Sequence, residues 1–333
     1  MQLQAENERL RGELAQLQAE NERLRGELAQ LQAAAPADSA GARLERMMHE
    51  IIRLQREAAA SAPQPAGARL ERMMHEIIRQ QREAFASAPQ VACAAQVVAR
   101  RHAAIFPQLR GSLRGRRVAL LGSGPSLRQA PALGACLTGA CNHSHLFLKD
   151  RAPDYYFAFD FRGNVVREAL AALPQSTSIF VGSSISPLCE APMQAPEQLQ
   201  DDPRITIYCD FAGVQPRIEL ESYPVYQCGT VMHDALHIML YMAPDVIYLL
   251  GCDCTPAGYF DERPNPGNSA ELLYSWRRGY TLLRSLQATH RPQTRIISVN
   301  PIGLRGVFED VYTTAFLKLS AQPPLQPQLI EAL

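Results

Sequence analysis

The sequence predicts an α/β fold, a doubly wound and mostly parallel sheet, preceded by an N-terminal α-helical coiled coil. From about residue 91 onward, short apolar runs of strand type alternate with helical patterns. Such alternation is typical of a parallel sheet with helices on both faces. Before that point leucines recur every seven residues, which is the spacing of a coiled coil. We therefore expect an α/β domain at 91–333 behind two helical segments.

The first segment, 1–33, is expected to form a leucine zipper. A fourteen-residue block is repeated without change, and leucines hold heptad spacing across 3–31. If these leucines occupy d positions, Asn7 and Asn21 occupy a positions, where buried asparagines favour a parallel, in-register dimer. We expect a homo-oligomer assembled through 3–31, at least a dimer, because leucine at both a and d leaves higher oligomers open.

A second duplication follows at 41–90. The thirteen residues at 41–53 return without change at 67–79, and both copies place apolar residues on one helical face. Linkers rich in Ala, Ser and Pro separate the copies. We expect this region to be a helical stalk that serves assembly and carries no catalytic residue.

The composition excludes several classes of protein. Lys and Arg number 33, as do Asp and Glu, so no net basic charge favours nucleic acid as a partner. The apolar stretch 235–250 is interrupted by His237, Pro244 and Asp245, which argues against a membrane span and leaves only peripheral membrane association open. The eight cysteines are scattered and are expected to be reduced thiols of a cytoplasmic protein.

The elements of the α/β domain are expected to follow one another in regular alternation, starting with a helix at 92–106 and a strand at 117–121. Runs of β-branched, aromatic and leucine residues bounded by turn residues predict further strands, at 146–148, 155–159, 179–181, 205–209, 246–250 and 295–299. Longer stretches with apolar residues at helical spacing predict helices, at 165–173, 231–242 and 270–287.

A loop containing two glycines ends the first strand. Glycine lets backbone N–H groups approach a ligand without an intervening Cβ, and a helix N-terminus behind such a loop favours an anion. We expect a nucleotide phosphate at Gly122, Ser123, Gly124 and Ser126. The dinucleotide fingerprint is excluded, because Leu127 stands where it requires a third glycine. The alternative is a tight turn that binds nothing.

Polar residues recur near the ends of the expected strands. Ligands of parallel α/β sheets bind outside the carboxyl ends of strands, so these residues are candidates for nucleotide or donor binding: Asn142, Asp160, Ser183, Gly229, Thr230, Asp253 and Asn300. Gly229 and Thr230 precede a helix and could hold a carboxylate on free N–H groups. A Pro- and Gly-rich loop with Tyr259, Asp261 and Glu262 could close over a ligand.

No metal site is expected. His143 and His145 would share one face of a strand, but without a matched carboxylate we favour packing or substrate contact. Cys252 and Cys254 flank a single residue, which is not the spacing of a structural zinc site.

Four motifs carry a resemblance to a known family. The glycine loop at 121–127 is followed by Cys141-Asn142-His143, by Gly229-Thr230 opening a helix, and by Ile-Tyr-Leu-Leu-Gly-Cys-Asp at 247–253. In order and spacing they resemble the bacterial sialyltransferases of glycosyltransferase family 42 and the related motility accessory factor domain of flagellin glycosylation. The resemblance covers about 117–319, so the zipper and stalk lie outside it.

The resemblance implies a Rossmann-like single domain. It would move a nonulosonic, sialic-acid-like sugar from a CMP-linked donor to a bacterial glycan or protein acceptor, with inversion and without an essential metal. The leaving cytidine phosphate needs hydrogen-bond donors, for which the family uses tyrosine hydroxyls. Tyr259 matches one of these positions, and Thr255 stands at the other, two residues beyond Asp253 of the Gly-x-Asp motif.

The same resemblance places the other candidate residues around the donor. The carboxylate of the sugar would lie near Gly229 and Thr230. Asn142 and Ser123 or Ser126 would face the nucleotide or its phosphate, and Asn300 would lie near the base.

One departure concerns the general base. The family uses a histidine between the Gly-x-Asp strand and the last helix, and 268–276 contains none. Deprotonating an acceptor hydroxyl needs a base in reach, so the sequence leaves several candidates open: Glu262, Asp261, Glu271, His233 and His237. Two other functions stay open as well, a catalytically degenerate oligomeric scaffold and a nucleotide-dependent diphosphotransferase on the same fold.

Overall fold

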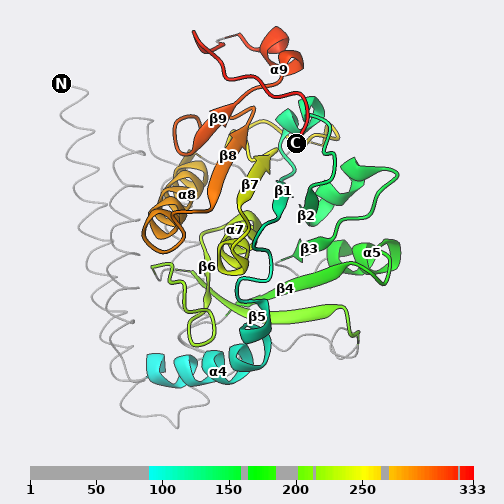
Figure 1. The fold of residues 1–333 in the computed structure, drawn as a ribbon. Coiled ribbons are helices and arrows are strands. Elements are labelled where there is room, and N and C mark those ends of the chain that lie inside the picture. The colour runs from blue at the N-terminus through cyan, green and yellow to red at the C-terminus, as the bar shows by residue number, and fades with distance from the viewer. Residues whose placement is uncertain (1–89, 159–163, 185–201, 213–214, 264–269, 322) are drawn as a thin grey trace, which may run out of the picture. The chain divides into compact units, whose positions relative to one another are not determined.

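A nine-stranded sheet forms the frame of the domain (Figure 1). The computed structural model describes residues 90–158, 164–184, 202–212, 215–263, 270–321 and 323–333. The expected zipper at 1–33 and almost all of the expected stalk at 41–90 lie outside these ranges. Residues Val91–Ser186 and Ala191–Leu333 belong to one compact unit, which the following paragraphs describe.

The sheet is parallel throughout, in the order β6-β5-β4-β3-β2-β1-β7-β8-β9. The strands are β1 Arg117–Leu121, β2 Leu137–Cys141, β3 Tyr155–Ala158, β4 Ser178–Ser184, β5 Ile205–Ala212, β6 Val225–Gln227, β7 Val246–Leu250, β8 Arg295–Val299 and β9 Glu309–Val311. The chain builds outward from β1 to β6 and then returns to place β7 on the other side of β1. The expected α/β class with a parallel sheet is confirmed.

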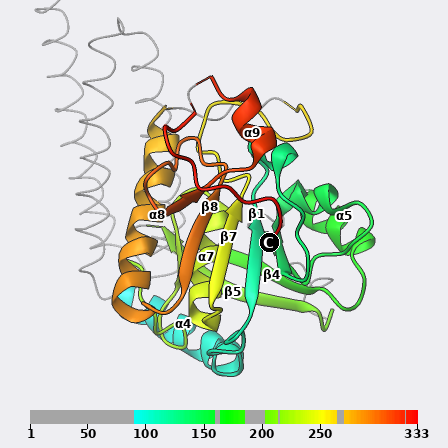
Figure 2. The same cartoon turned by 45° about the horizontal axis from the view of Figure 1, so that its top comes forward.

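Five α-helices and three 3-10 helices fall within the described ranges. They are α4 Gln90–Ile105, α5 Asn164–Ala172, α7 Val231–Met242, α8 Ala270–His290 and α9 Thr314–Leu319, with η1 Pro107–Leu109, η2 Pro125–Gln129 and η3 Asn142–Leu148. Figures 1 and 2 show α7 against the middle of the sheet, α8 near β8 and α5 near β3 and β4. None of the helices in these ranges has the length and apolar character to cross a bilayer.

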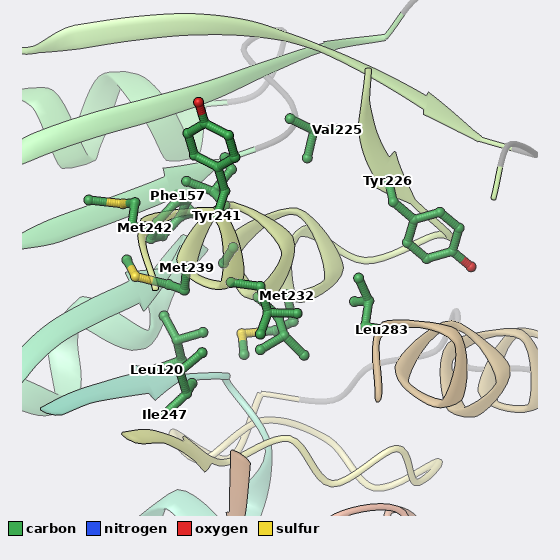
Figure 3. Packing of buried hydrophobic residues seen from close by; sticks show 14 of the residues in the cluster. Leu120, Phe157, Val225, Tyr226, Met232, Met239, Tyr241, Met242, Ile247 and Leu283 are labelled. Atoms are coloured by element: carbon green, nitrogen blue, oxygen red, sulfur yellow. The ribbon is translucent and has the colours of Figure 1, made fainter. Parts of the chain in front are cut away.

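Alternate residues of each central strand enter different apolar clusters, as the period of a β-strand requires. Leu120 of β1 and Ile247 of β7 pack with Met239 of α7 and Leu283 of α8 (Figure 3). On the other face, Ala119 of β1 joins a cluster that includes Tyr248 of β7 and Leu333. A third cluster joins β3 and β4 to α5. Helices and the C-terminal segment therefore cover both faces of the sheet.

The strand expected at 146–148 is wrong. These residues belong to η3, and the second strand is β2, at Leu137–Cys141. Leu146 is 54% exposed, which does not fit a strand in the middle of a sheet. Small residues fill β2 because space is short there: a Cβ on Gly139 would lie 2.6 Å from Cδ2 of Leu120. The three-residue strands β6 and β9 were not expected either.

Removing the Leu120 side chain should destabilise the domain. Leu120 is fully buried between β2 and α7, so Leu120→Ala is expected to lower the free energy of unfolding by about 2–5 kcal/mol through lost burial and a residual cavity. Denaturant unfolding of the full chain measures this. Leu325→Ala is the matched control, because that side chain is fully exposed and its loss should cost less than about 0.5 kcal/mol. Equal losses in the two variants would contradict the described core.

Candidate functional site

The candidate site lies where the strand order changes direction, at the carboxyl ends of β1 and β7. The chain leaves β1 toward β2, while β7 pairs with the other side of β1. In open parallel sheets the loops on the two sides of such a point diverge, and ligands bind in the crevice between them. The loops that begin at Gly122 and at Gly251 lie at this point.

The two loops are packed directly against each other. The N–H of Gly122 donates to Leu250 O (2.7 Å), and the N–H of Gly124 donates to Gly251 O (2.8 Å). A Cβ on Gly122 would lie 2.5 Å from Gly251 O, closer than any side chain tolerates. Gly251 has φ +64°, where a Cβ is strained. The glycines are therefore needed for contact between the loops, a reason that the sequence alone did not indicate.

Asp253 binds the first loop from the second. Its side chain is 4% exposed, and Oδ2 accepts a hydrogen bond from the N–H of Ser126 (2.8 Å). The hydroxyl of Ser126 donates to Oδ1 of the same carboxylate. A Cβ on Gly124 would lie 2.5 Å from Oδ2, so only glycine fits beside it. Burial raises the pKa of Asp253, and the two bonds from Ser126 oppose that rise.

Backbone hydrogen bonds occupy part of the loop at which a phosphate was expected. The N–H groups of Gly122, Gly124 and Ser126 donate to acceptors of the second loop, and that of Leu127 donates to Gly124 O (3.1 Å). The loop leads into η2, a 3-10 helix of five residues, rather than into an α-helix. Three of the main-chain donors expected to bind a phosphate are thus occupied, and the anion that Ser126 binds is the carboxylate of Asp253.

The segment that contains Tyr259 lies against the same loop. The N–H of Phe260 donates to Ser123 O (2.9 Å), and Arg128 of η2 donates to Phe260 O. The ring of Phe260 meets that of Phe147 in η3 edge to face, with centroids 6.1 Å apart. The structure therefore brings together the glycine loop, η3 and the Tyr259 segment, which the sequence placed far apart.

Charged side chains of this segment are paired with one another. Arg263 contacts Asp261 at 2.6 Å and lies 5.6 Å from the centre of the Tyr259 ring. The carboxylate of Glu262 lies 3.3 Å from Arg128, with both side chains exposed. Arg128 and Arg263 were not among the expected site residues. Nothing in the local sequence singles them out, because their position depends on the fold of the loop.

Asn300 and Asn142 have a backbone role that the sequence analysis did not consider. Their φ angles are +53° and +50°, in the left-handed region that asparagine tolerates better than most residues. The amide of Asn300 is buried, donates to Gln129 O (2.9 Å) and accepts from the N–H of Thr313 (2.8 Å). Asn300 thus ties η2 to the start of α9, and its amide is occupied by those bonds.

Gly229 and Thr230 open α7, as expected. Thr230 is the N-cap, and its hydroxyl accepts from the N–H of Met232 (3.3 Å). Gly229 has φ +80°, and its carbonyl accepts from the indole N–H of Trp276 (3.0 Å). Because α7 follows β6, its N-terminus lies at the carboxyl edge of the sheet, and the expected contact with a donor carboxylate stays a prediction.

His233 and His237 are not available as bases, which corrects two sequence candidates. His233 is buried between α7 and α8, where its Nε2 donates to Trp276 O (3.0 Å). His237 accepts from the N–H of Tyr226 at Nδ1 (2.8 Å) and donates from Nε2 to Arg217 O (2.7 Å). Burial lowers the pKa of each ring to about 4. Both histidines are packing residues.

A buried acid pair was missed by the sequence analysis. Asp210 of β5 and Asp234 of α7 are both fully buried, and the hydroxyl of Tyr208 donates to Oδ2 of Asp234 (2.7 Å). Burial first, and then the charge of Asp210, raise the pKa of Asp234 well above its ordinary value. A Cβ on Gly182 would lie 2.6 Å from Oδ2 of Asp210, and Ser183 follows on the same strand. The sequence signal that could have indicated this pair is the position of both aspartates within apolar stretches.

Three candidate site residues remain: Asp160, Glu271 and Thr255. Asp160 and the side chain of Glu271 lie outside the part of the chain that the structure describes. Thr255 is half-buried just beyond Asp253. Within the described ranges, no three His, Cys, Asp or Glu side chains are arranged to hold a metal ion.

Comparison with known proteins finds a family-model match for one segment only. A family model described as FAZ1, C-terminal, matches residues 4–34. It covers the expected zipper and no residue of the sheet, so it carries nothing about the site. No curated protein and no solved structure matches the chain.

Ser126→Ala should destabilise the domain by about 1.5–3 kcal/mol at pH 7, because it removes a hydrogen bond to a buried charge. The folded-state pKa of Asp253 is raised, so charging it disfavours folding as the pH rises above its ordinary value of 3.8. Without the Ser126 hydroxyl the folded-state pKa of Asp253 rises further. The loss of unfolding free energy caused by Ser126→Ala should therefore become smaller as the pH falls toward 4, where Asp253 is protonated in both proteins. Denaturant unfolding at several pH values measures the effect.

Ser112→Ala is the matched control for this prediction. Its hydroxyl donates to Leu109 O (2.9 Å) on the surface, far from Asp253 in the sequence. The control should cost less than about 0.5 kcal/mol at every pH. A loss in Ser126→Ala that is equally small, or that does not change with pH, would contradict the described pair.

Proposed function

We propose that residues 91–333 form a glycosyltransferase domain that moves a nonulosonic, sialic-acid-like sugar from a CMP-linked donor to a glycan or protein acceptor. The sequence resemblance over about 117–319 supports this proposal. The observation that carries it is the hydrogen bond from Phe260 to Ser123, because it holds the Tyr259 segment against the glycine loop at the β1–β7 switch point. On this proposal the finer fold is Rossmann-like and doubly wound.

The leaving phosphate is assigned to side chains rather than to the main chain. The amides of Gly122, Gly124 and Ser126 already have acceptors, so the charge that develops on CMP needs donors beyond this loop. Tyr259 is the first of these, with the Arg263 cation beside its ring. Thr255 is the second position that the resemblance indicates. No metal is required on this proposal, because hydrogen-bond donors meet the charge.

The assembly and location are proposed on the sequence alone. Heptads across 3–31 favour a homo-oligomer, at least a dimer, which would carry several transferase domains. We propose a cytoplasmic protein with reduced thiols and without nucleic acid as a partner. Six cysteines of the described part of the chain are free thiols: Cys136, Cys141, Cys209, Cys228, Cys252 and Cys254.

A second candidate function is an oligomeric scaffold whose transferase domain has lost activity. The observation that favours it is the packing of His233 and His237, which removes both of these sequence candidates for the base. This candidate and the first differ in one respect: a scaffold retains CMP binding without releasing CMP from a donor.

Binding of CMP tests the proposed function. A ligand that binds only the folded state at 100 times its Kd adds about 2.7 kcal/mol of stability. For a domain of this size that shift should raise the Tm of the full chain by roughly 5–10 °C. ATP at the same concentration is the control and should have no effect. A response to ATP alone would instead support the diphosphotransferase, and a Tm that neither nucleotide moves would rule out the proposal.

Tyr259→Phe should lower kcat by about 100- to 1,000-fold with a CMP-linked donor, because it removes one donor to the leaving phosphate. The folded state should be unaffected, since the Tyr259 ring is retained. Tyr274→Phe is the matched control, because Tyr274 is 70% exposed on α8 and should leave kcat unchanged. Release of CMP reports the rate. Equal rates in the two variants would remove Tyr259 from the site.

A further inference from the structure

The proposed transfer needs a proton acceptor, and the fold narrows the choice among histidines. Six histidines lie in the described part of the chain: His102, His143, His145, His233, His237 and His290. His102 joins His233 and His237 as a buried packing residue, because its Nδ1 donates to Leu220 O (2.7 Å) and its Nε2 accepts from the N–H of Cys209 (2.8 Å). Burial lowers the pKa of His102 to about 4.

Position excludes His290, and packing distinguishes His145 from His143. His290 ends α8, which leads into the start of β8, so it lies at the amino edge of the sheet, opposite the site. The ring of His145 donates from Nδ1 to Asn142 O (2.8 Å), which leaves its Nε2 lone pair free, and it packs edge to face against the Tyr156 ring of β3 at 5.6 Å. His143 is the histidine of η3 that interacts with Arg263 and Asp261 of the Tyr259 segment.

Three contacts fix η3, and with it His143, at the candidate site. The hydroxyl of Ser144 donates to Leu121 O (2.7 Å), at the last residue of β1, and accepts from the N–H of Cys141 (2.8 Å). The far end of η3 is attached to the Tyr259 segment by the contact between Phe147 and Phe260. His143 therefore stands between the carboxyl end of β1 and the segment expected to close over the donor.

The surroundings of His143 suit a base. Its ring is half-buried and makes no hydrogen bond within the described part of the chain. Burial is the largest influence and lowers the pKa of His143, as do Arg263 and His145, whereas Glu168 and Asp261 act in the opposite direction. The ring is therefore neutral at pH 7, with one nitrogen that can accept a proton.

Three nearby carboxylates are engaged by other groups. The bond from Arg263 holds the pKa of Asp261 below its usual range. Glu262 is paired with Arg128, and Asp253 is buried against Ser126. Each of these three carboxylates has a cation or a donor at its oxygens, whereas neither nitrogen of His143 has a hydrogen bond in the described part of the chain.

We propose that His143 is the general base of the transfer, an inference that rests on the proposed function. The acceptor oxygen forms a bond to the anomeric carbon of the donor while the bond from that carbon to the phosphate oxygen breaks. The electron pair of the broken bond leaves with CMP, and the acceptor proton passes to the unprotonated imidazole nitrogen of His143. Tyr259 stabilises the phosphate from the opposite segment.

The experiment compares the full-length wild type with His143→Gln and His290→Gln. Calorimetry with CMP measures nucleotide binding, release of CMP from CMP-linked N-acetylneuraminic acid measures turnover, and NMR follows the His143 ring, assigned by its loss in His143→Gln. We expect His143→Gln to bind CMP within threefold of wild type. Its kcat should fall by about 100- to 10,000-fold, and the decrease of kcat at low pH that wild type shows when His143 is protonated should disappear. Bound CMP, an anion, should raise the pKa of His143.

The outcomes separate this inference from the proposed function. His290→Gln should match wild type in all three measurements. If His143→Gln retains kcat within tenfold and keeps the decrease of kcat at low pH, His143 is not the base, although the transferase stands. If wild type binds CMP without moving the His143 resonance, the placement of His143 is overturned and nucleotide binding still stands. If wild type does not bind CMP, the proposed function fails, and this inference fails with it.

Discussion

The contact between the loops after β1 and β7 is the constraint on which the rest of the site depends. Asp253 accepts two hydrogen bonds from Ser126, and its own carbonyl accepts from the N–H of Gly303 (2.7 Å). Gly303 follows β8, and Arg277 of α8 donates to its carbonyl. One buried carboxylate and its backbone therefore connect the ends of three neighbouring strands and a helix. The Tyr259 segment, through Phe260, and Asn300, through Gln129, are attached to the loop and helix that this junction holds.

The sequence predicted those elements whose local pattern agrees with the fold. The bounds of α7 were predicted to the residue, because Thr230 caps its start and Pro244 follows the left-handed Ala243 at its end. The bounds of the apolar strands β1 and β7 were also predicted to the residue. In contrast, β2 was missed because small residues, which look like a loop, are what fits beside Leu120.

The position of the glycine loop was predicted from the sequence, but its contacts were not. Gly122 and Gly124 follow β1 at the carboxyl edge of the sheet, as expected, whereas the partner of Ser126 lies 127 residues away, and no local pattern predicts such a pairing. For the same reason His233 was taken as a candidate base. Its burial follows from α8, where a Cβ on Gly279 would lie 2.4 Å from its ring. Long-range packing decides which polar residues stay accessible.

The pair formed by Asp210 and Asp234 makes folding a proton-consuming reaction. In the unfolded chain Asp234 ionises near its ordinary pKa of 3.8, whereas burial and Asp210 raise its pKa in the folded domain, so that folding takes up protons above that pH. The stability from this group is complete below pH 3.8 and decreases as the medium becomes more alkaline. The contact between Tyr208 of β5 and Asp234 of α7 is therefore not weakened by acid through this group, whereas an alkaline medium does weaken it.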